Sequence, residues 1–154
     1  MNQENQIIYE LDTRNQKDSY VTKYFDKEGI KWIRNKLYAG DVKLLNDTRV
    51  IIDLKANTEE IAHNLCNTTE HLRIKRELEK AKEINCELFV FLIKDSKIKC
   101  KDDLINWSST KTKVKGSTLY KIMSTMSERY GCKFMFTTSK EAPKIIIKLL
   151  SERR

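Results

Sequence analysis

Two aspartates and a lysine within the stretch 40–55 are the residues of this chain best suited to chemistry. Asp41 opens the stretch, and Asp53 and Lys55 close it after an apolar run at 50–52. Because successive side chains of a strand point to opposite faces, Asp53 and Lys55 share one face. Carboxylates are ligands for Mg²⁺, which activates water and neutralises the charge of a phosphate. The pattern predicts a magnesium site for phosphodiester hydrolysis, with Asp41 and Asp53 as ligands.

Two neighbouring groups complete the expected site. The backbone carbonyl of Leu54 follows Asp53 directly and is expected to supply a third oxygen to the metal. The Lys55 ammonium is too strongly hydrated to be a metal ligand. We expect it to position the attacking water or to stabilise the negative charge that develops. Asp41, Asp53 and Lys55 are therefore the expected catalytic residues.

The register of one β-hairpin decides whether the two carboxylates meet. We expect strands near 41–45 and 49–55, turned at Asn46-Asp47. If paired residue numbers add to 94, Asp41 lies directly opposite Asp53, with Cβ atoms about 4.5–5.5 Å apart. If they add to 93, the carboxylates point to opposite faces. A metal site therefore requires the even register, or a β-bulge near Gly40 that restores it.

Other interpretations of these residue types stay open at this point. The Asp-x-Lys pattern is common and fits a surface hairpin with solvated charges. A second candidate metal site is formed by His63, Cys66 and His71, whose spacing suits three zinc ligands. The sequence offers no fourth ligand at a regular spacing, which favours ordinary surface or packed residues there.

The hydrophobic pattern of the rest of the chain predicts an α/β fold with a central mixed β-sheet flanked by helices. The run 88–93 is apolar throughout, so we expect it in the middle of the sheet with both faces covered. With 154 residues, a single domain over 1–154 is expected. Further strands are expected at 7–11, 30–37 and 133–137, and helices at 19–28, from 57 or 58, 70–85, 102–107, 117–130 and 140–152.

Composition points to a polyanionic partner. Lysine and arginine outnumber the acids by 30 to 22, a net charge of +8, which favours a nucleic acid as the partner. No apolar run approaches the roughly 20 residues of a membrane span, so no membrane partner is expected. The four cysteines have no CxxC spacing and suit reduced thiols in a cytoplasmic protein. For a protein that binds nucleic acid, we expect association with the nucleoid if the source is prokaryotic or viral.

Several motifs, in order along the chain, resemble the nuclease domain of the XPF-type structure-specific endonucleases, within the PD-(D/E)xK superfamily. IIYELDTR at 7–14 resembles the family's opening strand with its D-x-R-E motif. GDV at 40–42 resembles the G-D-Y segment, and VIIDLK at 50–55 resembles the V-x-E-R-K strand. HLRIKREL at 71–78 resembles the helix with R-x3-Q, and ERYGCKFMF with the last helix resembles the closing strand and helix. The resemblance implies a restriction-endonuclease-like nuclease core.

The resemblance also implies supporting residues around the metal site. By position in the motifs these are Asp12, Arg14, Glu59, Arg73 and Glu77. The chain departs from the family pattern where the acid of D-x-R-E is Asn15, the Arg of E-R-K is Leu54 and the family's Gln is Glu77. Arg73 and Glu77 also have the spacing of an ordinary helix salt bridge.

The resemblance implies a Mg²⁺-dependent DNA endonuclease, with Mn²⁺ as a substitute, that acts on branched, flap or junction DNA in repair or recombination. Lys111, Lys113 and Lys115, in a polar loop, are the expected contacts to DNA phosphates. The family usually carries a helix-hairpin-helix DNA-binding domain, which we do not expect after Arg154. Branch recognition would then come from this domain, a homodimer or a partner protein. The alternative is an inactive DNA-binding or scaffold protein, which Asn15 favours.

Overall fold

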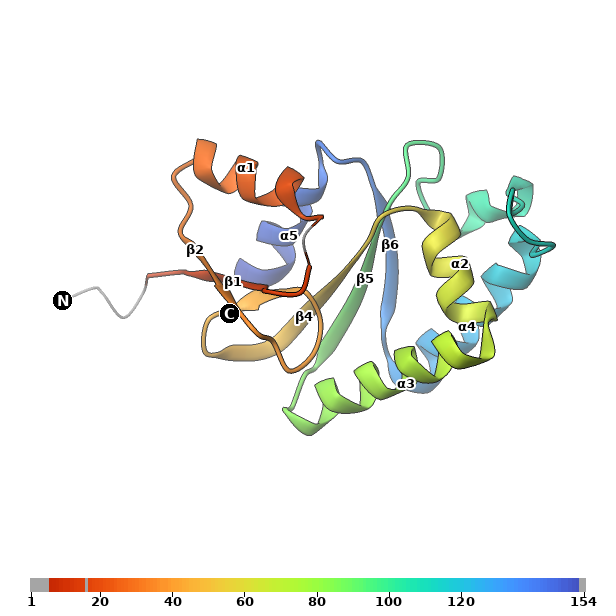
Figure 1. The fold of residues 1–154 in the computed structure, drawn as a ribbon, viewed down its shortest axis with the longest axis horizontal. Helices are drawn as coiled ribbons and strands as arrows, with labels where there is room; N and C mark the ends of the chain where they lie inside the picture. Colours follow the sequence, from red (N-terminus) through yellow and green to blue (C-terminus); the bar gives the residue numbers. More distant parts are fainter. Residues whose placement is uncertain (1–5, 16, 153–154) are drawn as a thin grey trace.

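The computed structural model describes residues 6–15 and 17–152, and a mixed six-stranded sheet forms its middle layer (Figure 1). The strand order is β2-β1-β3-β4-β5-β6, and only β3 runs against its neighbours. The expected fold class, a mixed sheet flanked by helices, is confirmed. The strands are β1 (Tyr9–Asp12), β2 (Trp32–Asn35), β3 (Val42–Leu44), β4 (Asp47–Lys55), β5 (Leu88–Lys94) and β6 (Lys133–Thr137).

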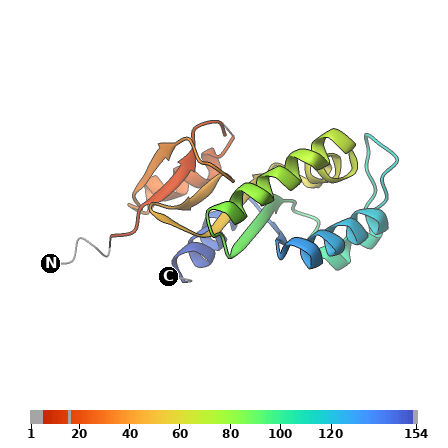
Figure 2. The same cartoon turned by 90° about the horizontal axis from the view of Figure 1, so that it is seen from below.

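Helices cover both faces of the sheet, as Figures 1 and 2 show from two directions. One face packs against α2 (Thr58–Cys66), α3 (Thr68–Glu83) and α4 (Gly116–Tyr130). The other face packs against α1 (Ser19–Lys27) and α5 (Ala142–Ser151). A short 3₁₀ helix, η2 (Lys101–Asn106), precedes α4. Among the described helices, none has both the length and the apolar character needed to cross a membrane.

Strand β5 divides the apolar core into its two halves. Its odd-numbered side chains, such as Phe91, pack in the cluster under α2, α3 and α4. Its even-numbered side chains, such as Val90, pack in the cluster under α1 and α5. Both residues are fully buried, and β5 runs parallel to β4 and β6 on either side. The expectation that this apolar run is a central strand is confirmed, because only a strand covered on both faces buries every side chain.

The hairpin of β3 and β4 has the even register at the end where the acids lie. Val42 pairs with Ile52, so the paired numbers add to 94. Near the turn, Leu44 pairs with Asp47, and the register shift lies between Val42 and Leu44 rather than near Gly40. The turn is at Leu45-Asn46 instead of the expected Asn46-Asp47. Asn46 has φ +63°, a conformation that asparagine tolerates well, and this lets β4 begin at Asp47.

Asparagine side chains cap two of the helices. Asn57 caps α2 by accepting a hydrogen bond from Glu60 N at 2.8 Å. Asn67 caps α3 by accepting from Glu70 N at 3.0 Å, so α3 begins before the expected residue 70. No side chain caps α5, which begins at Ala142, although the Thr138 hydroxyl accepts from Glu141 N at 3.2 Å. An asparagine before a helix competes well with threonine for this role.

Gly40 is required where the chain enters β3. Its φ of +75° suits glycine, and a Cβ there would clash with the side chain of Ile51 and lie 3.2 Å from the Ile52 carbonyl oxygen. Gly29 has a similar φ of +68°, but a Cβ there would meet nothing within 4 Å. A side chain at Gly29 would therefore cause backbone strain alone, whereas a side chain at Gly40 would cause both strain and a steric clash.

We expect Gly40→Ala to lower the free energy of unfolding by about 2–4 kcal/mol, because strain and overpacking add. Gly29→Ala adds strain alone and should lower it by only about 1–2 kcal/mol. Urea denaturation of both variants measures the difference. Equal losses would show that Ile51 does not restrict the position of Gly40.

Candidate functional site

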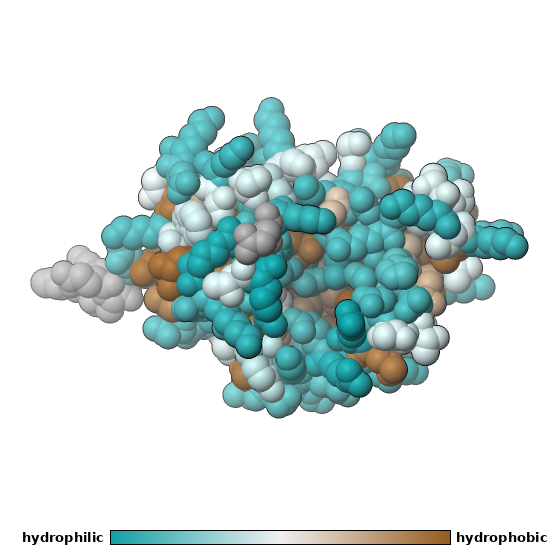
Figure 3. All heavy atoms as spheres, in the orientation of Figure 1, coloured by the Kyte–Doolittle hydropathy of each residue, from teal (hydrophilic) through white to brown (hydrophobic). Residues whose placement is uncertain are grey.

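A cleft of about 620 Å³ opens at the edge of the sheet where β1, β4 and β5 end and β3 begins. Strands that run in the same direction bring their carboxyl ends to one edge, so polar residues at these ends converge. Hydrophilic side chains dominate the face of the molecule that Figure 3 shows. The cleft is lined by Asp12, Arg14, Asn15, Lys17, Tyr20, Gly40, Asp41, Asp53, Leu54, Lys55, Ala56, Glu60, Glu77 and Lys94.

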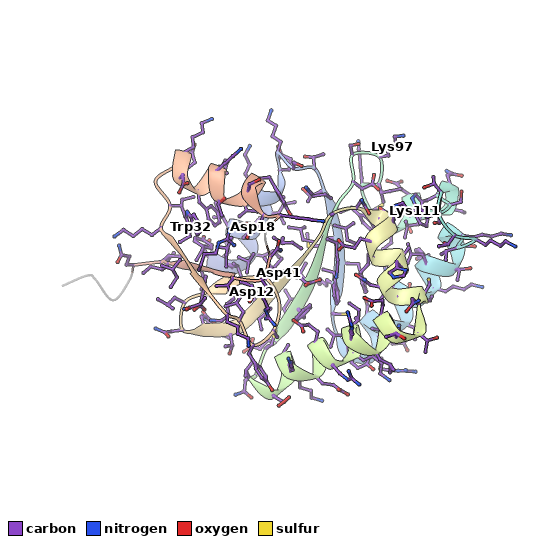
Figure 4. The ribbon with its side chains drawn as sticks, viewed as in Figure 1. Asp12, Asp18, Trp32, Asp41, Lys97 and Lys111 are labelled. Atoms are coloured by element: carbon purple, nitrogen blue, oxygen red, sulfur yellow. The ribbon has the colours of Figure 1, made fainter. Side chains whose placement is uncertain are left out.

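Asp41 is fixed in the cleft by the backbone on both sides of it. Its N–H donates to the Ile52 carbonyl at 2.8 Å, and its carbonyl accepts from Asp12 N at 2.9 Å. Its side-chain Oδ2 accepts from Leu54 N at 2.7 Å, across the start of the hairpin. Figure 4 shows Asp12 and Asp41 on the α1 side of the molecule. Asp41 therefore faces the end of β4, where Asp53 lies.

The carboxylates of Asp41 and Asp53 face each other, as the even register predicts. Burial raises the pKa of Asp41 well above its ordinary value, and the negative charge of Asp53 raises it further. The hydrogen bond from Leu54 N acts in the opposite direction without reversing the shift. The folded protein thus disfavours the charged form of Asp41.

Lys55 supplies a positive charge next to this pair. Its Nζ lies 3.0 Å from Asp53 Oδ2, and its side chain is only 12% exposed. Burial lowers the pKa of Lys55, but the charges of Asp53, Glu60 and Asp41 raise it, and the net shift is upward. Lys55 is therefore an ammonium at neutral pH, able to donate hydrogen bonds but not to accept a proton.

The acid pair fits a divalent cation. Apart from the ammonium of Lys55, Asp53 Oδ2 is a buried oxygen with no hydrogen-bond partner in the part of the chain that the structure describes. A cation between the two acids would remove their repulsion and coordinate this oxygen. The Leu54 N–H points to Asp41, and in a strand the carbonyl of the same residue points to the same side. The expected ligands Asp41, Asp53 and Leu54 thus lie around one place.

Asp12 and Arg14 line the cleft but are engaged with each other and with the loop before Gly40. Arg14 Nε lies 3.0 Å from Asp12 Oδ2, and Arg14 Nη2 donates to the Leu37 carbonyl at 2.7 Å. Asp12 Oδ1 also accepts from Leu37 N at 2.8 Å. The hydrogen bond to Asp12 raises the pKa of Arg14. Both residues therefore brace the segment that leads to Asp41.

Of the residues expected on the two helices after Lys55, only Glu77 lines the cleft. Its Oε2 accepts from Gly40 N at 2.5 Å and so holds the residue before Asp41. Arg73 is exposed outside the cleft and pairs with Glu70 at 3.4 Å rather than with Glu77. Placing Arg73 beside the site, or in a pair with Glu77, is therefore not supported by its position.

Glu59 also lies outside the cleft, where it holds the polar loop between η2 and α4. Its Oε1 accepts from Ser109 Oγ at 2.6 Å and from Thr110 N at 3.0 Å. Its neighbour Glu60 lines the cleft instead and accepts from Ala56 N at 2.6 Å. Successive side chains of a helix point in directions about 100° apart. The side chains of Glu59 and Glu60 therefore point to different places, and an assignment that is wrong by one residue selects the wrong side chain.

The loop 108–115 carries the three lysines expected to contact DNA. It lies at the end of the molecule farthest from β1 and β2 (Figures 1 and 2). Its base is closed by the bridge between Ser108 and Lys115 and by a hydrogen bond from Gly116 N to the Trp107 carbonyl at 2.8 Å. All three lysines are exposed on this loop and none lines the cleft: Lys111, Lys113 and Lys115.

Sequence reasoning missed four residues whose polar or charged side chains line the cleft: Lys17, Tyr20, Glu60 and Lys94. Lys94 was detectable, because it ends β5 and the parallel neighbour β4 ends at Lys55. Tyr20 and Lys17 enter from the segment around α1, whose position over the sheet no short pattern shows. Placing Glu60 in the cleft required knowing which face of α2 points toward it. Within the described residues no group of three or more His, Cys, Asp or Glu side chains is arranged for a metal, so His63, Cys66 and His71 form no zinc site.

The sequence and the fold of this chain match a known domain. The family model of the ERCC4 domain matches residues 11–150, a range that includes Asp12, Asp41, Asp53 and Lys55. The chain belongs to the ERCC4 domain family. The resemblance to XPF-type nuclease domains is thereby confirmed at the level of family and fold. No curated protein sequence is significantly similar to this ERCC4 domain.

Solved structures of XPF from Aeropyrum pernix share the fold. One aligns with a TM-score of 0.69 and 19% identity, covering 96% of this chain and 66% of that chain. Another, XPF from Aeropyrum pernix in complex with DNA, aligns with a TM-score of 0.71 and 18% identity, covering 96% and 64%. The chain thus spans a little under two thirds of the length of these XPF chains.

Replacing Asp41 by asparagine should stabilise the metal-free protein. Folding raises the pKa of Asp41, so the folded state loses stability as pH rises from about 4, the ordinary pKa of the carboxyl group. The asparagine amide would keep the oxygen that accepts from Leu54 N and remove the charge. We expect Asp41→Asn to have a higher Tm than the native protein in EDTA at pH 7.5. A lower Tm would show that the acid pair is not repulsive.

Glu59→Ala should release the loop 108–115 without affecting metal binding. Losing two hydrogen bonds to a charged group should open the loop and speed tryptic cleavage after Lys111 or Lys113 by about tenfold or more. Glu59→Gln keeps an acceptor oxygen and serves as the matched control. Unchanged cleavage in the alanine variant, or a loss of metal binding, would contradict this role of Glu59.

Proposed function

We propose that this ERCC4 domain is a metal-dependent endonuclease that hydrolyses phosphodiester bonds of DNA. One observation carries the proposal: two facing carboxylates, Asp41 and Asp53, share a cleft with the buried ammonium of Lys55. Family membership supports it, as do the net charge of +8 and the existence of an XPF structure in complex with DNA. A cation bound between the facing acids would remove the repulsion that raises the pKa of Asp41.

Asp41 and Asp53 would hold Mg²⁺, or Mn²⁺ in its place, with the Leu54 carbonyl as a third oxygen ligand. When bound, the metal lowers the pKa of water and neutralises charge on the phosphate. Lys55 would donate hydrogen bonds to the attacking water or to a phosphate oxygen on which negative charge grows. Asp12, Arg14 and Glu77 would act on the backbone around Asp41 and keep the first ligand in place.

The substrate we propose is branched, flap or junction DNA, as family membership suggests, in repair or recombination. Lys111, Lys113 and Lys115 would contact DNA phosphates at a distance from the cleft, so a bound strand would extend past α2. A homodimer or a partner protein would supply further branch recognition. The location we propose is the cytoplasm, or the nucleoid of a prokaryotic or viral system.

A second candidate function is DNA binding or scaffolding without cleavage. It is favoured by Asn15, which lines the cleft where the family has an acid and whose Oδ1 accepts from Lys17 N at 2.9 Å. An amide at this position removes one negative charge from the site. This candidate predicts salt-sensitive DNA binding with no cleavage in Mg²⁺ or Mn²⁺.

A cleavage assay separates the two candidates. The native protein is incubated with single-stranded, duplex, flap, fork and four-way DNA in Mg²⁺, Mn²⁺ or EDTA. We expect metal-dependent cleavage that Asp53→Asn and Lys55→Ala each reduce by about 10²–10³-fold. Lys133→Gln, at the opposite end of the sheet, is the control and should cleave normally. DNA binding without any cleavage would establish the inactive alternative.

A further inference from the structure

Lys94 is a cation of the cleft that the proposed mechanism does not use. It is the last residue of β5, is partly buried and lines the cleft with the acid pair. Its Nζ lies 4.1 Å from the centroid of the Tyr20 ring, which enters from α1. Among the described residues, Lys94 takes part in no ion pair. Its charge is therefore held in place but not neutralised.

The other cations of the cleft are committed to acids or lie at its rim. Lys55 pairs with Asp53, and Arg14 pairs with Asp12. Lys17 is exposed. Of the cations lining the cleft, Lys94 is thus the one that is both partly buried and without a carboxylate. A partly buried ammonium without an anion is costly unless a ligand supplies one.

Lys55 and Lys94 approach the cleft from opposite faces of the sheet. Lys55 pairs with Ile93 in the parallel ladder, so Lys94 is one residue further and points to the other face. Lys55 belongs to the face covered by α2, α3 and α4, and Lys94 meets Tyr20 on the face covered by α1 and α5. A chain of phosphates that crosses the edge of the sheet would pass both lysines.

We propose that Lys94, positioned by the ring of Tyr20, binds a phosphate of the DNA strand next to the phosphate that is cleaved. The site is a phosphate subsite on the α1 side of the acid pair, and it rests on the proposed nuclease function. A lysine suits this role as a point charge, and an aromatic face orients the ammonium without neutralising it.

The chemistry of Tyr20 fits a positioning role. Burial raises the pKa of Tyr20, and the negative charges of Asp41, Asp18, Glu60 and Asp53 raise it further. The phenol therefore stays neutral and leaves the charge of Lys94 available for a phosphate. Tyr20 touches Lys94 rather than the reacting atoms, so it is a positioning residue and not a catalytic one.

The salt dependence of DNA binding tests the subsite directly. Anisotropy of labelled fork and single-stranded DNA is measured in EDTA at several salt concentrations. We expect Lys94→Gln to bind about tenfold more weakly. In Lys94→Gln, the slope of log affinity against log salt concentration should also become less steep. The expected decrease is about 0.9 for a contact to duplex DNA or about 0.7 for a contact to a single strand, which corresponds to the loss of one phosphate contact. Lys133→Gln, which also removes one lysine, should match the native protein.

Cleavage kinetics add a readout that a purely structural role would not change. A neighbouring phosphate is bound equally before and during the reaction, so Lys94→Gln should raise KM about tenfold and leave kcat nearly unchanged. Lys55→Ala should instead lower kcat. A loss of kcat in Lys94→Gln with an unchanged KM would overturn the assignment and place Lys94 at the reacting phosphate.

A double-mutant cycle tests whether Tyr20 acts through Lys94. Tyr20→Leu should weaken DNA binding in the native background and have no further effect in the Lys94→Gln background. Tyr20→Phe keeps the ring and should bind normally, and thermal unfolding verifies that each variant is folded. Equal losses from Tyr20→Leu in both backgrounds would refute the positioning role.

The outcomes for the subsite and for the proposed function are distinct. If the native protein binds and cleaves DNA but Lys94→Gln keeps the full salt slope, the subsite is refuted and the nuclease stands. If the native protein does not bind DNA, both are refuted.

Discussion

Two carboxylates that would repel each other in water are held face to face in this fold, and much of the structure serves to keep them there. Asp41 precedes β3 and Asp53 lies near the end of β4, so their approach depends on the register of one hairpin. That register is set by apolar pairs such as Val42 with Ile52, which are fully buried. The free energy of core packing therefore opposes the repulsion between the acids.

The arrangement around the acids offsets only part of the repulsion. Lys55 compensates Asp53, and Leu54 N donates to Asp41, yet the pKa of Asp41 remains well above its ordinary value. Glu77 and Asp12 act on the backbone instead and hold Gly40 and Leu37. The surroundings thus fix where the acids lie but leave the charged form of Asp41 disfavoured. A site of this kind gains stability when it binds a cation, which is how ligand binding and folding are linked.

The sequence was sufficient for two features of the strands. The shared face of Asp53 and Lys55 follows from a period of two residues, and the unbroken apolar run at 88–93 predicts β5 as a central strand. The sequence left two registers open for the hairpin, and only the pairing of Val42 with Ile52 decides between them. Helical positions were less predictable. Glu59 and Glu60 differ by one residue and by about 100° of helix rotation, and only tertiary packing shows which of them faces the cleft. Lys94 and Tyr20 come from elements far apart in the chain, and no local pattern brings them together.

The most direct test of the central claim is a metal titration of the folded protein in the absence of DNA. Mn²⁺ binding followed by electron paramagnetic resonance should be saturable in the native protein. It should be lost or weakened by at least tenfold in both Asp41→Asn and Asp53→Asn, because each variant removes one of the two carboxylate ligands. Equal Mn²⁺ affinity in the native protein and both variants would contradict the claim that the acid pair is a metal centre.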